Sequence, residues 1–265
     1  MSTCSRNSIV LYLLGLLCAL AVWSCKGGRG TEPPQGTDYR IEAVVVQDQN
    51  LDTVTSLGLL FRTDTVVTNG SLGVGGDLLV FFPTAQQIDS VYFRQEDSVV
   101  RYAGTNQVIS FSDQDGLSDS LTASIVDTFS IEDFFPPTDT LDPPWQVQLD
   151  YTASVNTEAY VVAAVKTTEA YSGTGFSQYV QPSGLSGTIP PDAFLDAQTG
   201  NPIVGLYDMF VYAISGSPDS ALSAVFLPVP LPGQLVDNID RNQVKGRFGS
   251  VTVLLKRQIY VVTLP

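Results

Sequence analysis

The chain has 265 residues, enough for one large or two ordinary domains, and its 27 acidic and 13 basic residues give a formal net charge of −14. A surface this acidic repels polyanions, so nucleic acid is not expected as a partner. The sequence contains no histidine, which excludes Ser-His-Asp and Cys-His nucleophiles and every metal site built on imidazole.

The amino terminus has the layout of a signal peptide over residues 1–24. Arg6 supplies a positive charge, an apolar run follows over residues 9–23, and the small residue Ser24 precedes Cys25. An uncleaved membrane anchor is the alternative, but the apolar run is shorter than the roughly 20 residues that cross a bilayer. The layout favours export followed by cleavage.

The residues around the expected cleavage point, Val22-Trp23-Ser24-Cys25, resemble the lipobox of bacterial lipoproteins. Trp23 is bulkier than the residues usual at that position of the motif. The resemblance implies that Cys25 carries a diacylglyceryl group and an amide-linked fatty acid such as palmitate. Each buried methylene of such chains contributes about 0.8 kcal/mol to membrane attachment.

The cysteine count agrees with this interpretation. Cys4 and Cys18 lie in the segment that would be removed, so Cys25 would be the only thiol of the mature chain. No intrachain disulfide could then form, although exported proteins occupy compartments that permit disulfides. A lone cysteine at the cleavage point is interpreted as a lipid carrier, with an unused thiol as the alternative.

Residues 25–38 are rich in glycine and proline and have no apolar periodicity, which is typical of a flexible tether. Lys26, rather than an aspartate, follows the cysteine, and by analogy with enteric sorting this favours the outer membrane over the inner one. The sequence thus predicts a protein of the bacterial cell envelope that meets the membrane through its lipid, with the leaflet left open.

Residues 39–135 show short apolar runs separated by turn residues, the pattern of an antiparallel β-sandwich. No helical stripe is sustained. Strands are expected at 39–47, 54–61, 71–74, 78–82, 90–94, 99–102, 108–112 and 121–131.

Four prolines interrupt the pattern over residues 136–144, and because proline cannot donate to a sheet, a linker between two domains is expected there.

The second domain then covers 145–265. In it Trp145, Val147, Leu149 and Tyr151 alternate with polar residues, which predicts one buried face. A second alternating set, Tyr207, Met209, Val211 and Ala213, predicts another. Strands are also expected at 160–165, 188–189, 251–255 and 258–263.

Residues 143–216 resemble a fibronectin type III or related immunoglobulin-like module. The likeness lies in Trp145, the Ala159-Tyr160-Val161-Val162 run and the later Gly-x-Tyr-x-x-x-Val-x-Ala run. It implies that Trp145 packs in the core and that Tyr207 forms a tyrosine corner. The expected fold is therefore all-β, with two tandem antiparallel β-sandwiches.

One cluster of acids is considered as a ligand site. Asp113, Asp115 and Asp119 surround a glycine turn, and clustered carboxylate oxygens suit calcium. The helix-loop-helix calcium spacing fails, because Phe111 and Thr122 stand where its acidic ligands belong. An incomplete calcium loop of another kind and a hydrated hairpin turn remain the two interpretations, and no cofactor is expected.

These observations predict a non-catalytic envelope lipoprotein that acts as an interaction or structural module with a protein or glycan partner. A glycan-binding accessory protein is the alternative. The aromatic residues Phe176, Tyr179, Phe210 and Tyr212 fall in strand patterns, however, which favours core packing over sugar stacking. A hydrolase using two carboxylates about 5 to 9.5 Å apart is the third hypothesis.

Overall fold

The computed structural model describes residues 39–263 apart from 86–87, 99–100, 181–183, 234–235 and 242, so the signal peptide, Cys25 and the tether lie outside the described residues. Regular structure in the described part is almost entirely β, which confirms the predicted fold class. The helical segments are the short η2 (Thr167–Glu169), η3 (Pro191–Phe194) and α2 (Ser220–Ser223). None of the helices in these ranges has the length and apolar character needed to cross a membrane.

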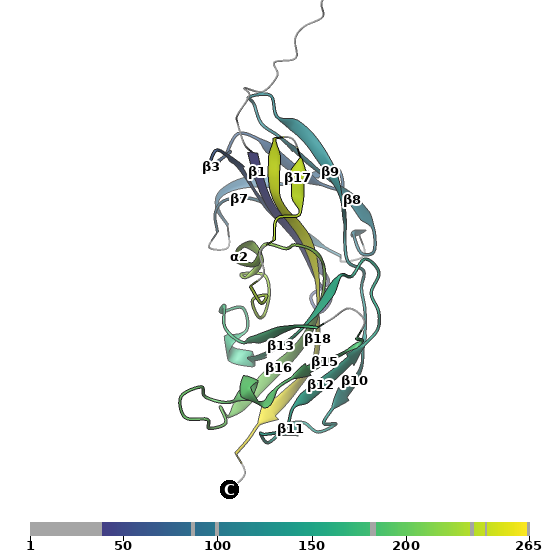
Figure 1. The fold of residues 1–265 in the computed structure, drawn as a ribbon, viewed down its shortest axis with the longest axis vertical. Helices are drawn as coiled ribbons and strands as arrows, with labels where there is room; N and C mark the ends of the chain where they lie inside the picture. Colours follow the sequence, from purple (N-terminus) through teal and green to yellow (C-terminus); the bar gives the residue numbers. More distant parts are fainter. Residues whose placement is uncertain are drawn as a thin grey trace, which may run out of the picture. The chain divides into compact units, whose positions relative to one another are not determined.

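The described residues form three sheets (Figure 1). The long sheet runs in the order β14 (Phe176–Val180), β13 (Ala159–Lys166), β16 (Gly205–Gly216), β18 (Val244–Val261), β1 (Tyr39–Asp48), β2 (Thr53–Arg62), β7 (Ile88–Asp97), β6 (Val80–Ala85), with β3 (Thr65–Val66) on β2 and with β11 (Thr140–Leu141) and β17 (Ile239–Arg241) on β18. The first covering sheet contains β5 (Asp77–Leu78), β4 (Ser71–Val74), β8 (Asn106–Ser112) and β9 (Ser118–Ser124). The second covering sheet contains β10 (Ile131–Phe135), β12 (Val147–Tyr151) and β15 (Ser186–Ile189).

Strand β18 joins the two halves of the chain. It pairs in parallel with β1, from Tyr39 opposite Val244 to Asp48 opposite Val253. It also pairs antiparallel with β16, up to Gly205 opposite Val261. Since its neighbours come from both halves of the chain, the long sheet is continuous, and Figure 1 shows β18 running beside β1 and then along β16.

The long sheet buries the same face under both covering sheets. Val244 and Phe248 of β18 belong to the first core, under the first covering sheet, whereas Ile259 and Val261 belong to the second core. Even-numbered residues face the covering sheets before Lys256 and odd-numbered residues do so after it. Lys256 is the extra residue of a β-bulge, because Phe210 pairs with residue 255 and the preceding residue with 257. The bulge lets one strand supply both sandwiches.

The other face of the long sheet packs against the segment 217–232, which includes α2. Leu222, Leu227, Val229 and Leu231 form a third core with residues of β1, β13, β16 and β18. In Figure 1, α2 and the β8–β9 pair lie on opposite sides of β1 and β18. The long sheet is therefore buried on both faces in its middle, which explains the nearly unbroken apolar runs of β1 and β16.

A buried arginine attaches this segment to the sheet. Arg247 on β18 donates to Asp219 at 2.6 Å and to Glu42 of β1 at 2.9 Å, and its side chain is only 9% exposed. The other oxygen of Asp219 accepts from the backbone N–H groups of Ala221 and Leu222, both at 2.9 Å, and so caps α2. One carboxylate thus starts the helix and binds it to the sheet.

Polar side chains in the middle of the long sheet hold the chain where it crosses from the first covering sheet to the second. The crossing segment, 125–130, is not a strand, so its buried backbone groups need other partners. Gln47 donates to the carbonyl of Val126 at 2.7 Å and to the hydroxyl of Thr252 at 2.7 Å, while Ser250 accepts from the N–H of Val126 at 3.0 Å. Gln49 both donates to and accepts from the backbone of Phe129. These contacts are called the polar seam below.

The predicted strands are largely present, with four differences. The expected strand 121–131 is two strands, because the crossing segment separates β9 from β10. The expected pair 251–255 and 258–263 is the single strand β18. The expected strand 78–82 is divided between β5 and β6. The expected strand 99–102 is not seen in its described residues, 101 and 102, which lie outside any strand.

The structure also differs from the predicted domain division into 39–135 and 145–265. The described residues all belong to one compact unit. Within the expected linker 136–144, β11 pairs with β18, and β10 pairs with β12 across it. The first and second cores lie under the two covering sheets, as two sandwiches would require, but β1 pairs with β18 in parallel, which makes the long sheet common to both.

We expect Ser250→Ala to lower the free energy of unfolding by about 1–3 kcal/mol, because it leaves the buried N–H of Val126 without its acceptor. Ser56→Ala is the matched control: this serine is also buried in the long sheet, and its hydroxyl makes no hydrogen bond among the described residues. Urea denaturation measures both variants. Equal losses of stability in the two would contradict a role for the seam.

Candidate functional site

The candidate site is a pocket at one end of the second sandwich, with a volume of about 370 Å³. We call it the mouth pocket. It lies where β13 and β16 meet η2, η3 and the start of β14. Its lining consists of Ala164, Val165, Lys166, Glu169, Gly175, Phe176, Asp192, Ala193, Ile203 and Tyr207.

Local packing around Tyr207 shapes this pocket. The ring of Phe194, at the end of η3, meets the Tyr207 ring edge to face, with centroids 5.3 Å apart. The Tyr207 hydroxyl donates to the carbonyl of Ile203 at 3.1 Å, and the N–H of Ile203 donates to the carbonyl of Phe194 at 2.8 Å. Burial, and then the charge of Glu169, raise the pKa of Tyr207 to about 12. Tyr207 therefore stays protonated as a fixed part of the pocket wall.

Three charged side chains line the mouth pocket, namely Lys166, Glu169 and Asp192. None of their charged groups makes a hydrogen bond or ion pair with the described residues. Lys166 is half-buried, and its stem lies over Gly205 on the neighbouring strand, where an added Cβ would come within 3.4 Å of it. In contrast, each arginine of the described ranges has a carboxylate partner.

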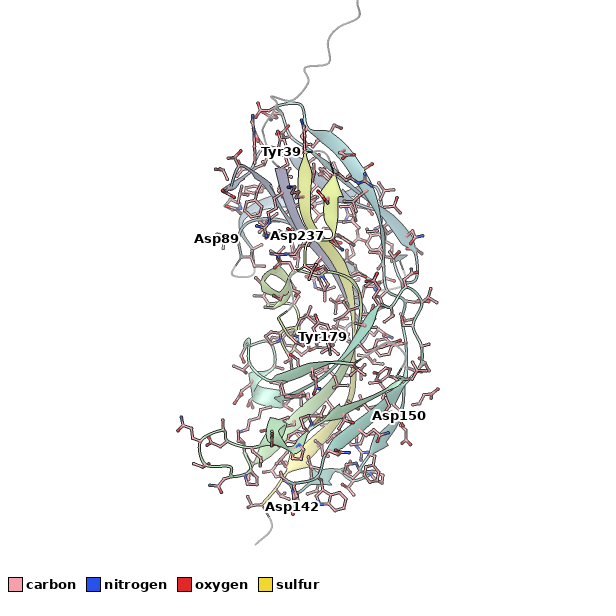
Figure 2. The ribbon with its side chains drawn as sticks, viewed as in Figure 1. Tyr39, Asp89, Asp142, Asp150, Tyr179 and Asp237 are labelled. Carbon is pink, nitrogen blue, oxygen red and sulfur yellow. The ribbon has the colours of Figure 1, made fainter. Side chains whose placement is uncertain are left out.

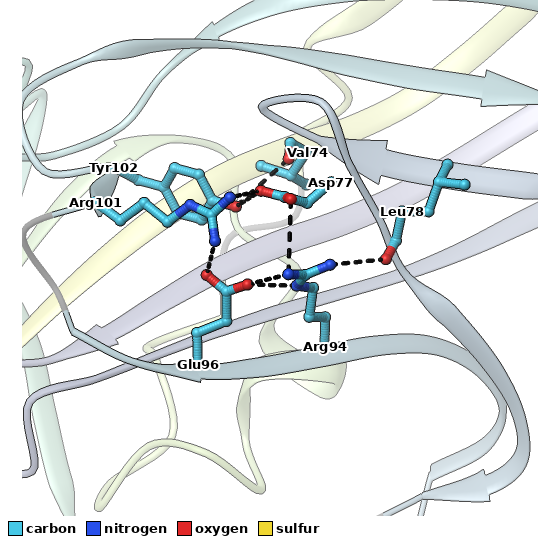
Figure 3. Close-up of polar contacts among 7 residues, drawn as sticks. All are labelled: Val74, Asp77, Leu78, Arg94, Glu96, Arg101 and Tyr102. Atoms are coloured by element: carbon cyan, nitrogen blue, oxygen red, sulfur yellow. Dashed lines mark hydrogen bonds and ion pairs between the residues drawn. The ribbon is translucent and has the colours of Figure 1, made fainter.

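A second polar cluster lies between the first covering sheet and β7 (Figure 3). Arg94 and Arg101 both pair with Glu96 and with Asp77. The Tyr102 hydroxyl donates to Asp77 at 2.9 Å. The cluster joins residues of β5 and β7 and the turn that precedes β8, so its geometry is that of a structural clamp.

The titration of this clamp follows from the same contacts. The hydrogen bond from Tyr102, followed by the one from Arg101, lowers the pKa of Asp77 below its usual 3.8. Burial, and then the hydrogen bond to Asp77, raise the pKa of Tyr102 to about 12. Asp77 is therefore ionised and Tyr102 neutral at pH 7, and neither is poised to exchange a proton.

The acids considered for calcium have protein partners. Asp113 accepts from the Tyr39 hydroxyl at 2.5 Å and from the N–H groups of Asp115 and Leu117 at 3.0 and 2.8 Å. Burial would raise the pKa of Asp113, but these hydrogen bonds outweigh it and lower the pKa.

The other two acids of this loop lie next to arginine side chains. Asp115 pairs with Arg62, and Asp119 lies 3.9 Å from Arg241. In the described part of the chain no group of three acidic or cysteine side chains is arranged to hold a metal ion. The loop has the contacts of a β8–β9 hairpin turn.

The chain's acidic charge is spread over many elements. Figure 2 labels Asp89 on β7 and Asp237 before β17 in the upper half of the ribbon, and Asp150 on β12 and Asp142 after β11 in the lower half.

Of the two residues to which the fibronectin resemblance assigned a role, one lies where expected and the other does not. Tyr207 is buried at the start of β16 and bonds a carbonyl four residues upstream, which is the geometry of a tyrosine corner. Trp145, however, is 55% exposed and precedes β12, so its predicted core position is wrong. Alternation alone could not show that β12 begins two residues later. The remaining residues of that predicted face, Val147, Leu149 and Tyr151, are in the second core as expected.

The strand aromatics divide in the same way. Phe210 and Tyr212 are buried in the third core, and Tyr179, labelled in Figure 2, packs half-buried against it. Of the four aromatic residues considered for sugar stacking, Phe176 lines the mouth pocket and the other three do not. The sequence analysis did not identify the charged residues of that pocket. The sequence offered two weak signals for them: Lys166 ends the buried run of β13, and Asp192 follows two prolines.

No protein-family model matches the chain, and no curated protein matches its sequence. Among solved structures it is similar to a cytokine receptor complex, with 14% identity and a TM-score of 0.24 over 72% of this chain and 98% of that one. It is also similar to the FN1–FN3 domains of chicken CNTN1, with 10% identity and a TM-score of 0.26 over 84% of this chain and 64% of that one. Scores this low bear on neither fold nor function, so the β-sandwich architecture stands on the strand pairing of the chain itself.

We expect Asp77→Asn to destabilise the protein by about 1 kcal/mol at pH 7, the usual range for exposed ion pairs in a network. The folded-state pKa of Asp77 is depressed, so its stabilising contribution is present above pH 3.8 and is lost as the pH falls through the folded-state pKa. The difference between variant and parent should shrink below about pH 4. Asp240→Asn, an exposed acid without a partner in the described ranges, is the control. A difference between Asp77→Asn and the parent that does not shrink at all as the pH falls below 3.8 would contradict the clamp.

Removing the Tyr207 hydroxyl tests the tyrosine corner. Tyr207→Phe should cost about 1 kcal/mol of unfolding free energy, because the hydrogen bond to Ile203 is lost inside a packed site. Tyr260→Phe changes a tyrosine that is 45% exposed and should leave the stability nearly unchanged. Thermal unfolding of the two variants side by side provides the measurement, and no difference between them would show that the corner contributes nothing.

Proposed function

We propose that this chain is a non-catalytic lipoprotein of the bacterial cell envelope, anchored through Cys25, whose two sandwiches serve as one structural or interaction module. The proposal combines the lipobox-like sequence with the architecture of the described residues. The outer membrane is the proposed location, because Lys26 follows the acylated cysteine.

The continuous long sheet is the observation that carries the module part of this proposal. β18 pairs with strands on both sides, and the polar seam holds the crossing segment on the sheet. Tandem modules joined by a linker bend at the linker by default. A shared sheet instead resists bending, so the unit suits a role in which two surfaces must be kept at a fixed spacing.

The paired carboxylates support a structural role. The most buried pairing, Arg247 with Asp219 and Glu42, holds an element on the sheet, and the clamp at Asp77 joins two sheets. Carboxylates committed to such contacts stabilise structure and have no free position for a reacting group.

A glycan-binding accessory role is the second candidate, and the mouth pocket is the observation that favours it. The pocket combines an aromatic side chain with three charged groups that make no hydrogen bond or ion pair with the part of the chain that the structure describes. Its two acids, Glu169 and Asp192, are also the kind of pair that a glycoside hydrolase needs. Release of reducing sugar from a bound oligosaccharide would therefore identify the chain as a hydrolase and not a binding protein.

Anchoring is tested by labelling cells with radioactive palmitate. We expect the chain to take up label, Cys25→Ala to abolish it, and Cys18→Ala, the matched control in the segment to be removed, to retain it. Label on Cys25→Ala, or none on the parent, would overturn the lipid anchor while leaving the described fold untouched.

The module role is tested in the envelope itself. The anchored chain should crosslink to a defined partner in intact cells, or its deletion should change envelope integrity. If neither occurs, the structural or interaction role is contradicted.

A further inference from the structure

We propose that the mouth pocket binds the end of a neutral saccharide, with Phe176 packing against a sugar ring and with Lys166, Glu169 and Asp192 bonding its hydroxyls. The inference rests on the second candidate function above and adds the site and the class of ligand. It follows from the pocket's size, its apolar part and the signs of its charges.

The size and floor of the pocket fit a small ligand. Its volume of about 370 Å³ lies at the lower end of the range of small-molecule sites. Phe176 and Ala193 pack against the second core from its edge, so their outer surfaces form an apolar part of the pocket. An aromatic ring in that position can pack against the apolar face of a sugar ring.

The wall of the pocket is held in place before any ligand arrives. The Phe194 ring, the Tyr207 hydroxyl and the backbone bonds of Ile203 hold η3 against β16. Gly205 leaves room for the stem of Lys166, which keeps the ammonium group near the pocket. A preformed site loses less entropy on binding than a mobile one.

The charges favour a ligand that both donates and accepts. Glu169 and Asp192 accept hydrogen bonds and Lys166 donates them, and a hydroxyl group can satisfy either kind. Phosphate and other anions would meet two carboxylates and an overall charge of −14. A simple cation would meet the ammonium group of Lys166. A neutral polyhydroxyl compound therefore fits the pocket better than either ion.

The experiment uses the full-length protein, purified in detergent, and measures binding by saturation-transfer NMR and titration calorimetry. The probes are glucose, galactose, mannose, N-acetylglucosamine, cellobiose and maltose, with inorganic phosphate and putrescine as the anionic and cationic comparisons. We expect at least one sugar to bind with a dissociation constant on the order of 1 mM, and phosphate and putrescine to bind more weakly.

Two isosteric variants place the binding in the pocket. Glu169→Gln and Asp192→Asn should each weaken sugar binding by about tenfold, or about 1.4 kcal/mol, since the neutral amide oxygen still accepts from a hydroxyl but without the negative charge that strengthens the bond. Both side chains are exposed, so the fold should persist in the variants. The controls are Glu132→Gln and Asp240→Asn, exposed acids outside the pocket, which should bind like the parent.

The outcomes separate the site from the function. Sugar binding that the pocket variants do not weaken would keep a glycan-binding function and overturn this site. Absence of binding by every sugar tested, or tighter binding of phosphate or putrescine, would overturn the inference. None of these results bears on palmitate labelling at Cys25, which tests the anchor independently.

Discussion

The structure depends on the pairing of one strand with neighbours from both halves of the chain. β18 is 18 residues long and lies between β1 and β16, so both cores are built on the same hydrogen-bonded ladder. In a regular strand, alternate residues face the same side of the sheet. The extra residue Lys256 shifts this alternation by one position, so even-numbered residues face the first core and odd-numbered residues face the second. Lys256 itself donates to the carbonyl of Ile131 at 2.9 Å, which fastens the bulge to the start of the second covering sheet.

The polar seam supplies hydrogen-bond partners to the chain where it crosses between the two covering sheets. A chain that leaves one covering sheet and enters the next must pass over a buried part of the long sheet without being a strand. Its amide groups would cost about 1–3 kcal/mol each if left without partners. Gln47, Ser250 and Thr252 are fully buried polar residues because they meet this need. They explain why an otherwise apolar sheet has polar residues at its centre.

Much of the local structure could be read from the sequence, and most of the long-range structure could not. Alternation at Tyr207, Met209 and Val211 placed these residues on the right face, because the two-residue period of a strand is a local property. The parallel pairing of β1 with β18 joins positions about two hundred residues apart, and no local pattern encodes it. The prolines at 136–144 predict a domain boundary because they interrupt the strand pattern, but β11 lies in that segment and pairs with β18. The mouth pocket was missed for the same reason, since Lys166 and Asp192 become neighbours only when η3 packs against the end of β13 and β16.

The central claim is that the two sandwiches are one body sharing a sheet, and native-state hydrogen exchange along β18 tests it most directly. Amides of Val244–Val253 lie beside the first half of the chain, and those of the following residues to Val261 belong to the second sandwich. The account predicts that the slowest-exchanging amides in both stretches report the same free energy of opening and respond equally to added denaturant. Two distinct opening energies, with the first stretch exchanging while the second stays protected or the reverse, would contradict it.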